Sequence, residues 1–292
     1  MKQRQLDETF MEALKSGVLK SLLIAVQEDD TLCMELRGDS VNIYYRGGSL
    51  FKISQKDGNY ILSFDTNYTE GKMSLSPNPS VSEAVENIPF YKRAMDCYFH
   101  AHPHYEREFQ QTLLRENNNS GNISRATDYY IVDIEYADAD ARFDMVAFKW
   151  ISNGATRKNN KKLSLALIEV KYGDGALDGT AGIKKHLKDF NEFLGNKDKL
   201  KLFRDDMETV FKQKCELGLM DGLQDHQFDV KLTEEVETIF IFANHDPDSK
   251  KLDKILDSID WAEYQPFPVY AARSSKMGYG LFVDCLQDLR KQ

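Results

Sequence analysis

Two stretches of the chain place ionisable side chains inside otherwise apolar segments. In LSLALIEVKYG, residues 163–173, Glu169 and Lys171 follow the uncharged run LALI, and in RFDMVAF, residues 142–148, Asp144 lies among apolar neighbours. A buried charge is costly unless it is paired, so each of these residues needs a physical reason. Two carboxylates held close together repel each other and are stable mainly around a divalent cation. An ammonium beside them could stabilise negative charge on a phosphate.

A β-sheet is needed to bring these residues together. Side chains alternate faces along a strand, so Glu169 and Lys171 point the same way while Val170 points to the opposite layer. The apolar run before Glu169 is typical of a central strand that is buried on both faces. If the two stretches pair, Asp144 and Glu169 converge at one edge of the sheet. We therefore expect these two carboxylates to bind Mg²⁺ or Mn²⁺, with the Val170 carbonyl as a further ligand and Lys171 activating water.

The pattern around these stretches predicts an α/β arrangement on a mixed sheet. After residue 100 the order is helix, three strands, helix, strand. The expected elements are a helix at 105–117, strands at 129–137, 142–150 and 163–173, helices at 181–195 and 197–219, and strands at 237–246 and 267–272.

The first 90 residues predict an accessory region. Residues 6–27 predict one amphipathic helix, because apolar side chains recur at helical spacing: Phe10, Leu14, Val18, Leu22 and Val26. Short alternating runs, separated by Gly-Asp, Gly-Gly and Asp-Gly, follow it and predict an antiparallel β-meander. The proline-containing segment 73–90 is the expected boundary. This divides the chain into an accessory region at 1–90 and a core at 91–292.

The arrangement of Asp144, a spacer and then Glu169-Val170-Lys171 resembles the PD-(D/E)xK nuclease superfamily, which includes restriction endonucleases and Holliday-junction resolvases. The likeness covers roughly residues 100–250 and includes the order of elements, with Phe143 where the family normally has proline. It implies a restriction-endonuclease-like fold, in which a mixed sheet is flanked by helices. It also implies Mg²⁺-dependent hydrolysis of phosphodiester bonds in DNA.

The resemblance extends to the two helices that flank the strands. The family often carries a glutamate on the helix before the first strand, and Glu106 is the candidate there, with Glu108 as the competing choice. This glutamate would assist a second metal ion or the attacking water. On the following helix the family often has a polar residue. His186 is placed there, with Lys185 as the alternate, and would contact substrate phosphate.

The hairpin sequence YYRGG offers a candidate outside this likeness. Arg46 with Tyr44 and Tyr45 could contact phosphate or stack on bases. The alternative, aromatic packing across strands with Gly47-Gly48 as the turn, stays open.

Charge and hydropathy limit the partners. The net charge of −9 argues against a protein that coats nucleic acid, but residues 149–204 hold 13 Lys/Arg against 6 Asp/Glu, so DNA is expected in one groove. No apolar run approaches the roughly 18 residues of a membrane span. The first residues also lack the apolar stretch of a signal peptide, so we expect no membrane partner and a cytoplasmic location. A homodimer is left open.

Other interpretations compete with the nuclease. A catalytically inactive nuclease-fold protein could bind nucleic acid or protein and keep Asp144 and Lys171 as a structural ion pair. A carboxylate-pair glycosidase would leave Lys171 without a role.

The histidines of HAHPH have no partner ligands at zinc-like spacing, and the sequence NHDPDS lacks the glycine of a calcium loop, so a capping loop and a turn are expected there. The four cysteines predict free thiols.

Overall fold

The computed structural model of the chain describes residues 3–118, 127–138, 141–159, 162–220, 223, 230–264 and 267–291. These residues form a mixed α/β structure with one antiparallel and one mixed sheet. The chain divides into two compact units, each described by itself below. Unit 1 holds Glu116–Glu208 and Gln227–Gln292, and unit 2 holds Lys2–Arg115 and Thr209–His226.

Unit 2 opens with two short helices where the sequence predicted one. Helix α1 (Glu8–Lys15) ends at the cap Ser16, and α2 (Lys20–Gln27) follows. The chain folds back so tightly at Gly17 that a Cβ there would lie 2.8 Å from the Cα of Ala13, which only glycine allows. The single helix over 6–27 is therefore wrong. Val18, expected on the buried face, is 66% exposed.

The predicted meander is confirmed as an antiparallel sheet. Its strands pair in the order β1-β2-β3-β4, with bounds β1 (Leu32–Leu36), β2 (Ser40–Tyr45), β3 (Gly48–Lys56) and β4 (Asn59–Ser63). Arg46 and Gly47, both with positive φ, form the turn between β2 and β3. The short helix η1 (Thr66–Thr69) follows the sheet.

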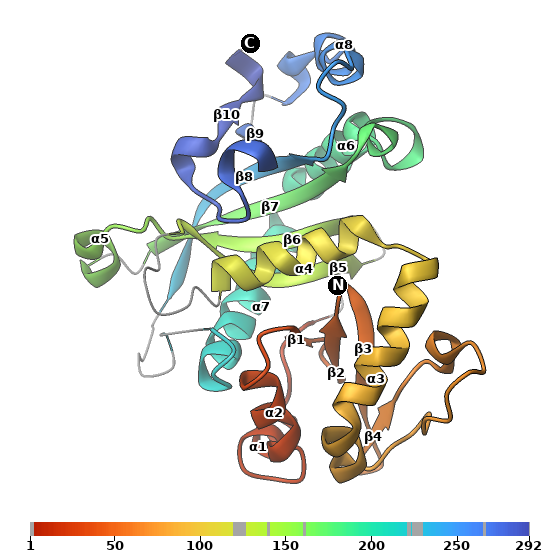
Figure 1. Cartoon of the computed structure of the whole chain (residues 1–292). Helices are drawn as coiled ribbons and strands as arrows, with labels where there is room; N and C mark the ends of the chain where they lie inside the picture. Colours follow the sequence, from red (N-terminus) through yellow and green to blue (C-terminus); the bar gives the residue numbers. More distant parts are fainter. Residues whose placement is uncertain are drawn as a thin grey trace. The chain divides into compact units, whose positions relative to one another are not determined.

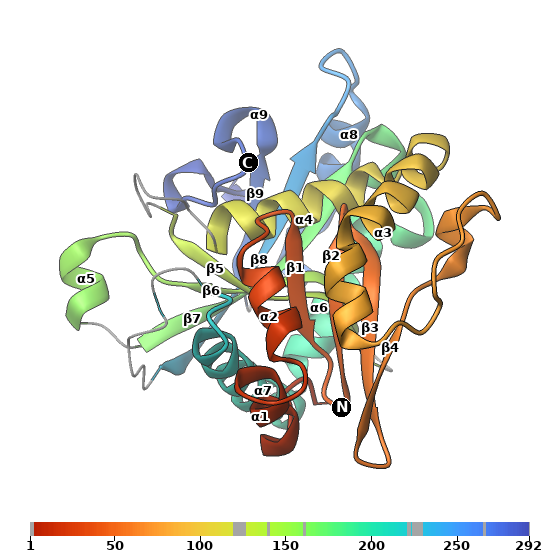
Figure 2. The same cartoon turned by 60° about the horizontal axis from the view of Figure 1, so that its bottom comes forward.

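Helix α3 (Val81–Ala101) covers this sheet and spans the expected boundary (Figure 2). The ring of Tyr91 packs edge-on against Phe51 of β3 at 4.9 Å. Ser80 and Glu83 form a capping box that starts the helix, so the division expected after residue 90 falls inside a capped helix. Helix α4 (Tyr105–Asn118) comes next, and Arg115 is the last of its residues in unit 2.

Unit 1 is built on a mixed sheet with the order β10-β9-β8-β7-β6-β5 (Figure 1). The bounds are β5 (Tyr129–Asp138), β6 (Ala141–Lys149), β7 (Lys162–Tyr172), β8 (Lys231–Ala243), β9 (Val269–Arg273) and β10 (Gln287–Asp288). Strands β5, β6 and β7 pair antiparallel, whereas β7, β8 and β9 run parallel. The strands expected from the sequence are therefore confirmed, and β7 is an interior strand.

Helix α6 (Ile183–Gly195) packs on this sheet through aromatic side chains. Phe190 contacts Phe143 of β6 at 5.6 Å and Phe240 of β8 at 5.8 Å. Phe203, from the unit 1 part of α7 (Lys197–Glu216), joins this core against Phe143. The remaining helical segments are short: α5 (Gly154–Asn159), α8 (Lys251–Asp257), α9 (Ser274–Met277), η2 (Asp174–Leu177), η3 (Gly179–Ala181), η4 (Trp261–Tyr264), η5 (Val283–Cys285) and η6 (Leu289–Lys291).

Candidate functional site

Strand β7 positions the first two candidate residues as the sequence predicted. It lies between β6 and β8, and its side chains from Leu165 to Lys171 are buried. Glu169 is 4% exposed and Lys171 is 3% exposed. Because both residues are on the same face of the strand, they meet: the Lys171 Nζ donates a hydrogen bond to the Glu169 Oε1 over 2.9 Å.

His186 of α6 contacts the same carboxylate. Its Nε2 lies 2.9 Å from the Oε1 of Glu169. Within the described residues neither ring nitrogen makes a hydrogen bond of regular geometry. The Glu169 Oε2 is buried and lacks a hydrogen-bond partner in the same part of the chain. Unsatisfied buried polar atoms are rare in proteins, so the Glu169 Oε2 and the His186 Nδ1 indicate a place for a water, a ligand or an ion.

The charges around Glu169 keep it ionised. Burial by itself raises the pKa of this carboxyl, but the contacts with His186 and Lys171 outweigh burial and leave the pKa below its ordinary value. Glu169 is therefore a carboxylate at neutral pH. A buried carboxylate in this state is available as an oxygen ligand.

Asp144 reaches the same segment through the main chain. The ladder between β6 and β7 extends to the pair of Met145 and Ile168, and the Asp144 Oδ2 accepts a hydrogen bond of 2.8 Å from the Val170 N–H. In an extended strand the N–H and C=O of one residue point to the same side, so the Val170 carbonyl is also directed toward β6. The structure thus brings Asp144 to the residue between Glu169 and Lys171.

These groups fit an Mg²⁺ or Mn²⁺ ion in their chemistry. Carboxylate oxygens of Asp144 and Glu169 and the carbonyl of Val170 are the hard oxygen ligands that such ions prefer. The unsatisfied Oε2 of Glu169 is the oxygen that an ion would satisfy. In the described ranges, no cluster of three His, Cys, Asp or Glu side chains is close enough to hold a metal by itself. An ion here would therefore also depend on the main chain and on water.

A second polar cluster at this end of β7 was not recognised as part of a site from the sequence. His245 follows β8, and its Nε2 lies 3.1 Å from the Lys171 carbonyl while its Nδ1 lies 3.0 Å from the Asp174 Oδ1. Both atoms that face the ring are acceptors, so the imidazole satisfies both contacts only with an N–H on each nitrogen. The hydrogen bond from Ser249 and then the contact with His245 lower the pKa of Asp174.

The signal for this cluster is the position of polar residues after two neighbouring parallel strands. Lys171 pairs with Phe242, so the loops after β7 and β8 start at the same edge of the sheet. The sequence NHDPDS was interpreted only as a turn. That turn is confirmed, because the Asp246 Oδ1 accepts a hydrogen bond from the Asp248 N–H. His245, which precedes this turn, also contacts the main-chain carbonyl of Lys171.

Two further candidates of the predicted site are Lys185 and Glu106. Lys185 is exposed on α6 and pairs with Asp189. Glu106 lies on α4 and belongs to unit 2, so its expected role at the metal site stays a prediction.

Arg46 also belongs to unit 2, where its guanidinium pairs with Glu108 and, over 2.8 Å, with Asp96. The hydrogen bond to Glu108 is the main reason that the pKa of Arg46 is raised. Arg46 is thus neutralised inside its own unit, which does not favour a phosphate contact. The competing glutamate, Glu108, is occupied by the same pairing.

The HAHPH segment and the four cysteines, for which the sequence predicted no role in a site, have the local structure that was expected. His102 is the C-cap of α3, as expected of a capping loop. Cys33, Cys97, Cys215 and Cys285 are free thiols. In the part of the chain that the structure describes, no helix combines the length and the apolar character needed to cross a membrane.

Comparison of the chain with protein-family models, with curated proteins and with solved structures finds no match in any of the three. The assignment of function therefore depends on the geometry of the site.

Proposed function

We propose that the protein is a metal-dependent nuclease that hydrolyses phosphodiester bonds in DNA, on a restriction-endonuclease-like core of the PD-(D/E)xK type. The observation that carries this proposal is the buried contact of Glu169 with Lys171 and His186. There an ionised carboxylate keeps one oxygen without a partner among the described residues. An ion or a water would satisfy this oxygen, which is otherwise costly to bury.

The roles of the residues follow from their positions. Asp144, Glu169 and the Val170 carbonyl would hold Mg²⁺ or Mn²⁺. The ion, when bound, would lower the pKa of a bound water and offset negative charge on the phosphate. Lys171 would orient the attacking water and balance the charge that develops on the non-bridging oxygens. The water oxygen gives up a proton and forms a bond to phosphorus, while the bond from phosphorus to the leaving sugar oxygen breaks and the leaving oxygen takes up a proton.

His186 and the basic stretch would serve the substrate rather than the water. The His186 ring lies beside Glu169, and its Nδ1 has no hydrogen-bond partner among the described residues. Residues 149–204 carry 13 Lys/Arg against 6 Asp/Glu, within a chain of net charge −9. DNA would therefore be attracted to this part of the protein, and its affinity should fall steeply as salt rises.

A second candidate is a nuclease-fold protein that binds nucleic acid or another protein without cleaving it. One observation favours this candidate. The chain holds another buried pair, in unit 2, where the Lys214 Nζ donates to the Glu35 Oε1 over 2.7 Å. A buried Glu–Lys pair is thus also present in unit 2, and the pair in β7 could have a purely structural role.

Cleavage assays with matched variants separate the two candidates. Wild type should cut at least one form of DNA, single-stranded, double-stranded or branched, in Mg²⁺ and not in a chelator. Glu169→Gln and Lys171→Met should each lose about 10²- to 10³-fold or more in rate. Lys214→Met, which breaks the pair in unit 2, is the control and should keep the activity of the folded fraction. If wild type binds no divalent metal and cuts no DNA form, the enzymatic proposal is abandoned.

A further inference from the structure

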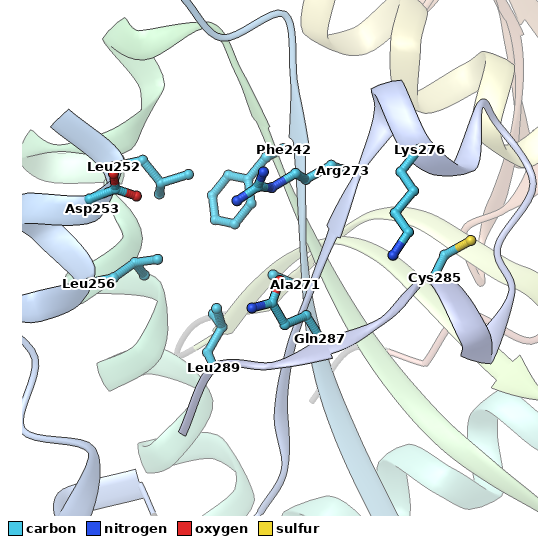
Figure 3. A pocket seen from close by; sticks show the side chains of 10 residues that line it. All are labelled: Phe242, Leu252, Asp253, Leu256, Ala271, Arg273, Lys276, Cys285, Gln287 and Leu289. Atoms are coloured by element: carbon cyan, nitrogen blue, oxygen red, sulfur yellow. The ribbon is translucent and has the colours of Figure 1, made fainter. Parts of the chain in front are cut away.

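A cavity of about 200 Å³ lies where β9 and β10 face helix α8 (Figure 3). Its floor is apolar and includes Phe242 of β8, Ala271 of β9 and Leu256 of α8. Sites for drug-sized ligands usually measure about 300–1,000 Å³. The cavity can therefore enclose only one part of such a ligand, while the rest lies at its open rim.

Two cations reach into this cavity from the side of β9 and α9. Arg273 and Lys276 are exposed, no hydrogen bond or ion pair of their side chains is found in the described part of the chain, and Figure 3 shows both among the lining side chains. Gln287 of β10 adds an amide that can donate hydrogen bonds. Asp253 lies on the opposite side, on α8. The cavity thus offers an anion site at one end, an apolar floor and an acceptor at the other end.

The sheet register connects this cavity to the candidate site. Lys171 of β7 pairs with Phe242 of β8, and Phe242 pairs with Arg273 of β9. Residues paired across parallel strands share a face, and the stacking of Phe240 on Phe242 at 6.3 Å is in accord with one common face. Strands are spaced about 4.8 Å apart, so Arg273 lies about 10 Å from Lys171 along this row. Each nucleotide of a duplex advances about 3.4 Å along the helix axis, so this distance corresponds to roughly three nucleotides of one strand of a duplex.

We propose that this cavity binds one nucleotide of a nucleic-acid strand, with its phosphate on Arg273 and Lys276 and its base over Phe242. The proposal rests on the proposed function in that it places this nucleotide on the strand that Glu169 and Lys171 would cleave. The base would lie on the apolar floor, and a base amino group would donate to Asp253. The same chemistry, a phosphate on a nucleoside, is offered by a strand end and by a free mononucleotide.

Cys285 provides a direct readout, because it lines the cavity and is partly exposed. A bound nucleotide should shield this thiol from an alkylating reagent. Cys97 is exposed and lies in unit 2, so its alkylation rate is the internal control. The other two thiols react slowly, because burial raises the pKa of Cys33 and of Cys215 to about 12. Mass spectrometry of the peptides then reports the two rates separately in the intact chain.

Four probes distinguish the sources: an oligonucleotide with a terminal phosphate, the same strand without it, a free deoxynucleoside monophosphate and inorganic phosphate. A chelator is present with every probe, so that no metal-dependent cleavage changes the probe during the assay. The phosphorylated strand should slow Cys285 alkylation at least about tenfold and leave Cys97 unchanged. Arg273→Gln and Lys276→Gln should each weaken this protection about tenfold or more, because each removes a charged hydrogen bond. Lys254→Gln, an exposed charge on α8 outside the cavity lining, is the matched control and should keep it.

Each outcome is decisive. Protection by the phosphorylated strand alone assigns the cavity to a strand end, and equal protection by the monophosphate assigns it to any nucleotide of this class. Equal protection by inorganic phosphate would show that the cavity binds phosphate alone, and would contradict a role for the base and the sugar. No protection by any probe, or unchanged protection in both pocket variants, would overturn it. Glu169→Gln should still show protection, so a failure of the nuclease proposal and a failure of this one are distinguishable.

Discussion

The Nζ of Lys171 and the Oε1 of Glu169 lie 2.9 Å apart in the interior of a sheet, two residues from each other on one strand. Removing either partner would leave the other charge buried, which is why this pair has consequences for both stability and chemistry. The pair differs from a closed salt bridge because the second oxygen of Glu169 lacks a hydrogen-bond partner in the described chain.

Replacement of Lys171 by methionine should destabilise unit 1 by about 3–5 kcal/mol, because it leaves Glu169 buried beside only His186. The double variant Glu169→Gln with Lys171→Met should recover most of this loss, because no charge remains unpaired. Urea unfolding of wild type, both single variants and the double variant measures the coupling. Additive losses in the double variant would contradict a direct interaction.

Divalent-metal binding should require both carboxylates. Asp144→Asn and Glu169→Gln should weaken Mn²⁺ binding by more than the roughly 10- to 100-fold that loss of an outer-shell group costs. Glu192→Gln, an exposed carboxylate on α6, is the control and should bind as wild type does. Isothermal titration with Mn²⁺ measures these affinities, and equal binding by all four proteins would place the ion elsewhere.

The turn between β2 and β3 should tolerate only glycine at position 47. Gly47 and Gly71 have nearly the same φ, 74° and 71°, but a Cβ on Gly47 would lie 2.5 Å from backbone and side-chain atoms of Arg107, whereas Gly71 has open space. Gly71→Ala should cost about 1–2 kcal/mol for its backbone conformation, and Gly47→Ala should cost about 1–3 kcal/mol more for the contact. Denaturant unfolding of the two variants measures the difference. Equal losses would show that Arg107 moves away without cost.

Acid stability should depend on Asp174. Its folded pKa is lowered, first by the hydrogen bond from Ser249 and then by His245. The unfolded chain therefore binds a proton at Asp174 more readily than the folded chain does. The contribution of this carboxylate is complete above its unfolded pKa of about 3.9 and is lost as pH falls through the lower folded pKa.

Wild type should thus lose stability more steeply than Asp174→Asn below about pH 4. Urea midpoints between pH 3 and pH 6 test this, with Asp178→Asn as a nearby exposed control. Parallel pH curves for wild type and Asp174→Asn would contradict the assignment.

The sequence predicted those features that depend on local spacing. The run from Leu165 to Ile168 indicates a buried strand by composition alone, and the position of Lys171 on the face of Glu169 follows from alternation. The placement of His186 next to the strand ends followed from the family resemblance, whereas its contact with Glu169 was not predicted. Each of these inferences needs only one element or two neighbouring elements.

The remaining features depend on contacts between distant segments. The break at Gly17 arises from close approach to Ala13, which a helical period does not report. Arg46 is neutralised by Asp96, 50 residues away, and by Glu108, so the residues next to it in the sequence do not indicate these ion pairs. The place of His245 depends on the in-register pairing of β7 and β8, which fixes which loops meet.

The most direct measurement of the central claim is anomalous diffraction from a crystal soaked in Mn²⁺. The nuclease proposal predicts an anomalous peak between the Asp144 and Glu169 carboxylates, within about 2.0–2.6 Å of their oxygens, on the side of the Val170 carbonyl. The peak should be absent in Glu169→Gln crystals soaked in the same way. No peak at this position in wild type, in a crystal where Mn²⁺ occupies other sites, would contradict the account and favour the non-catalytic nuclease-fold protein.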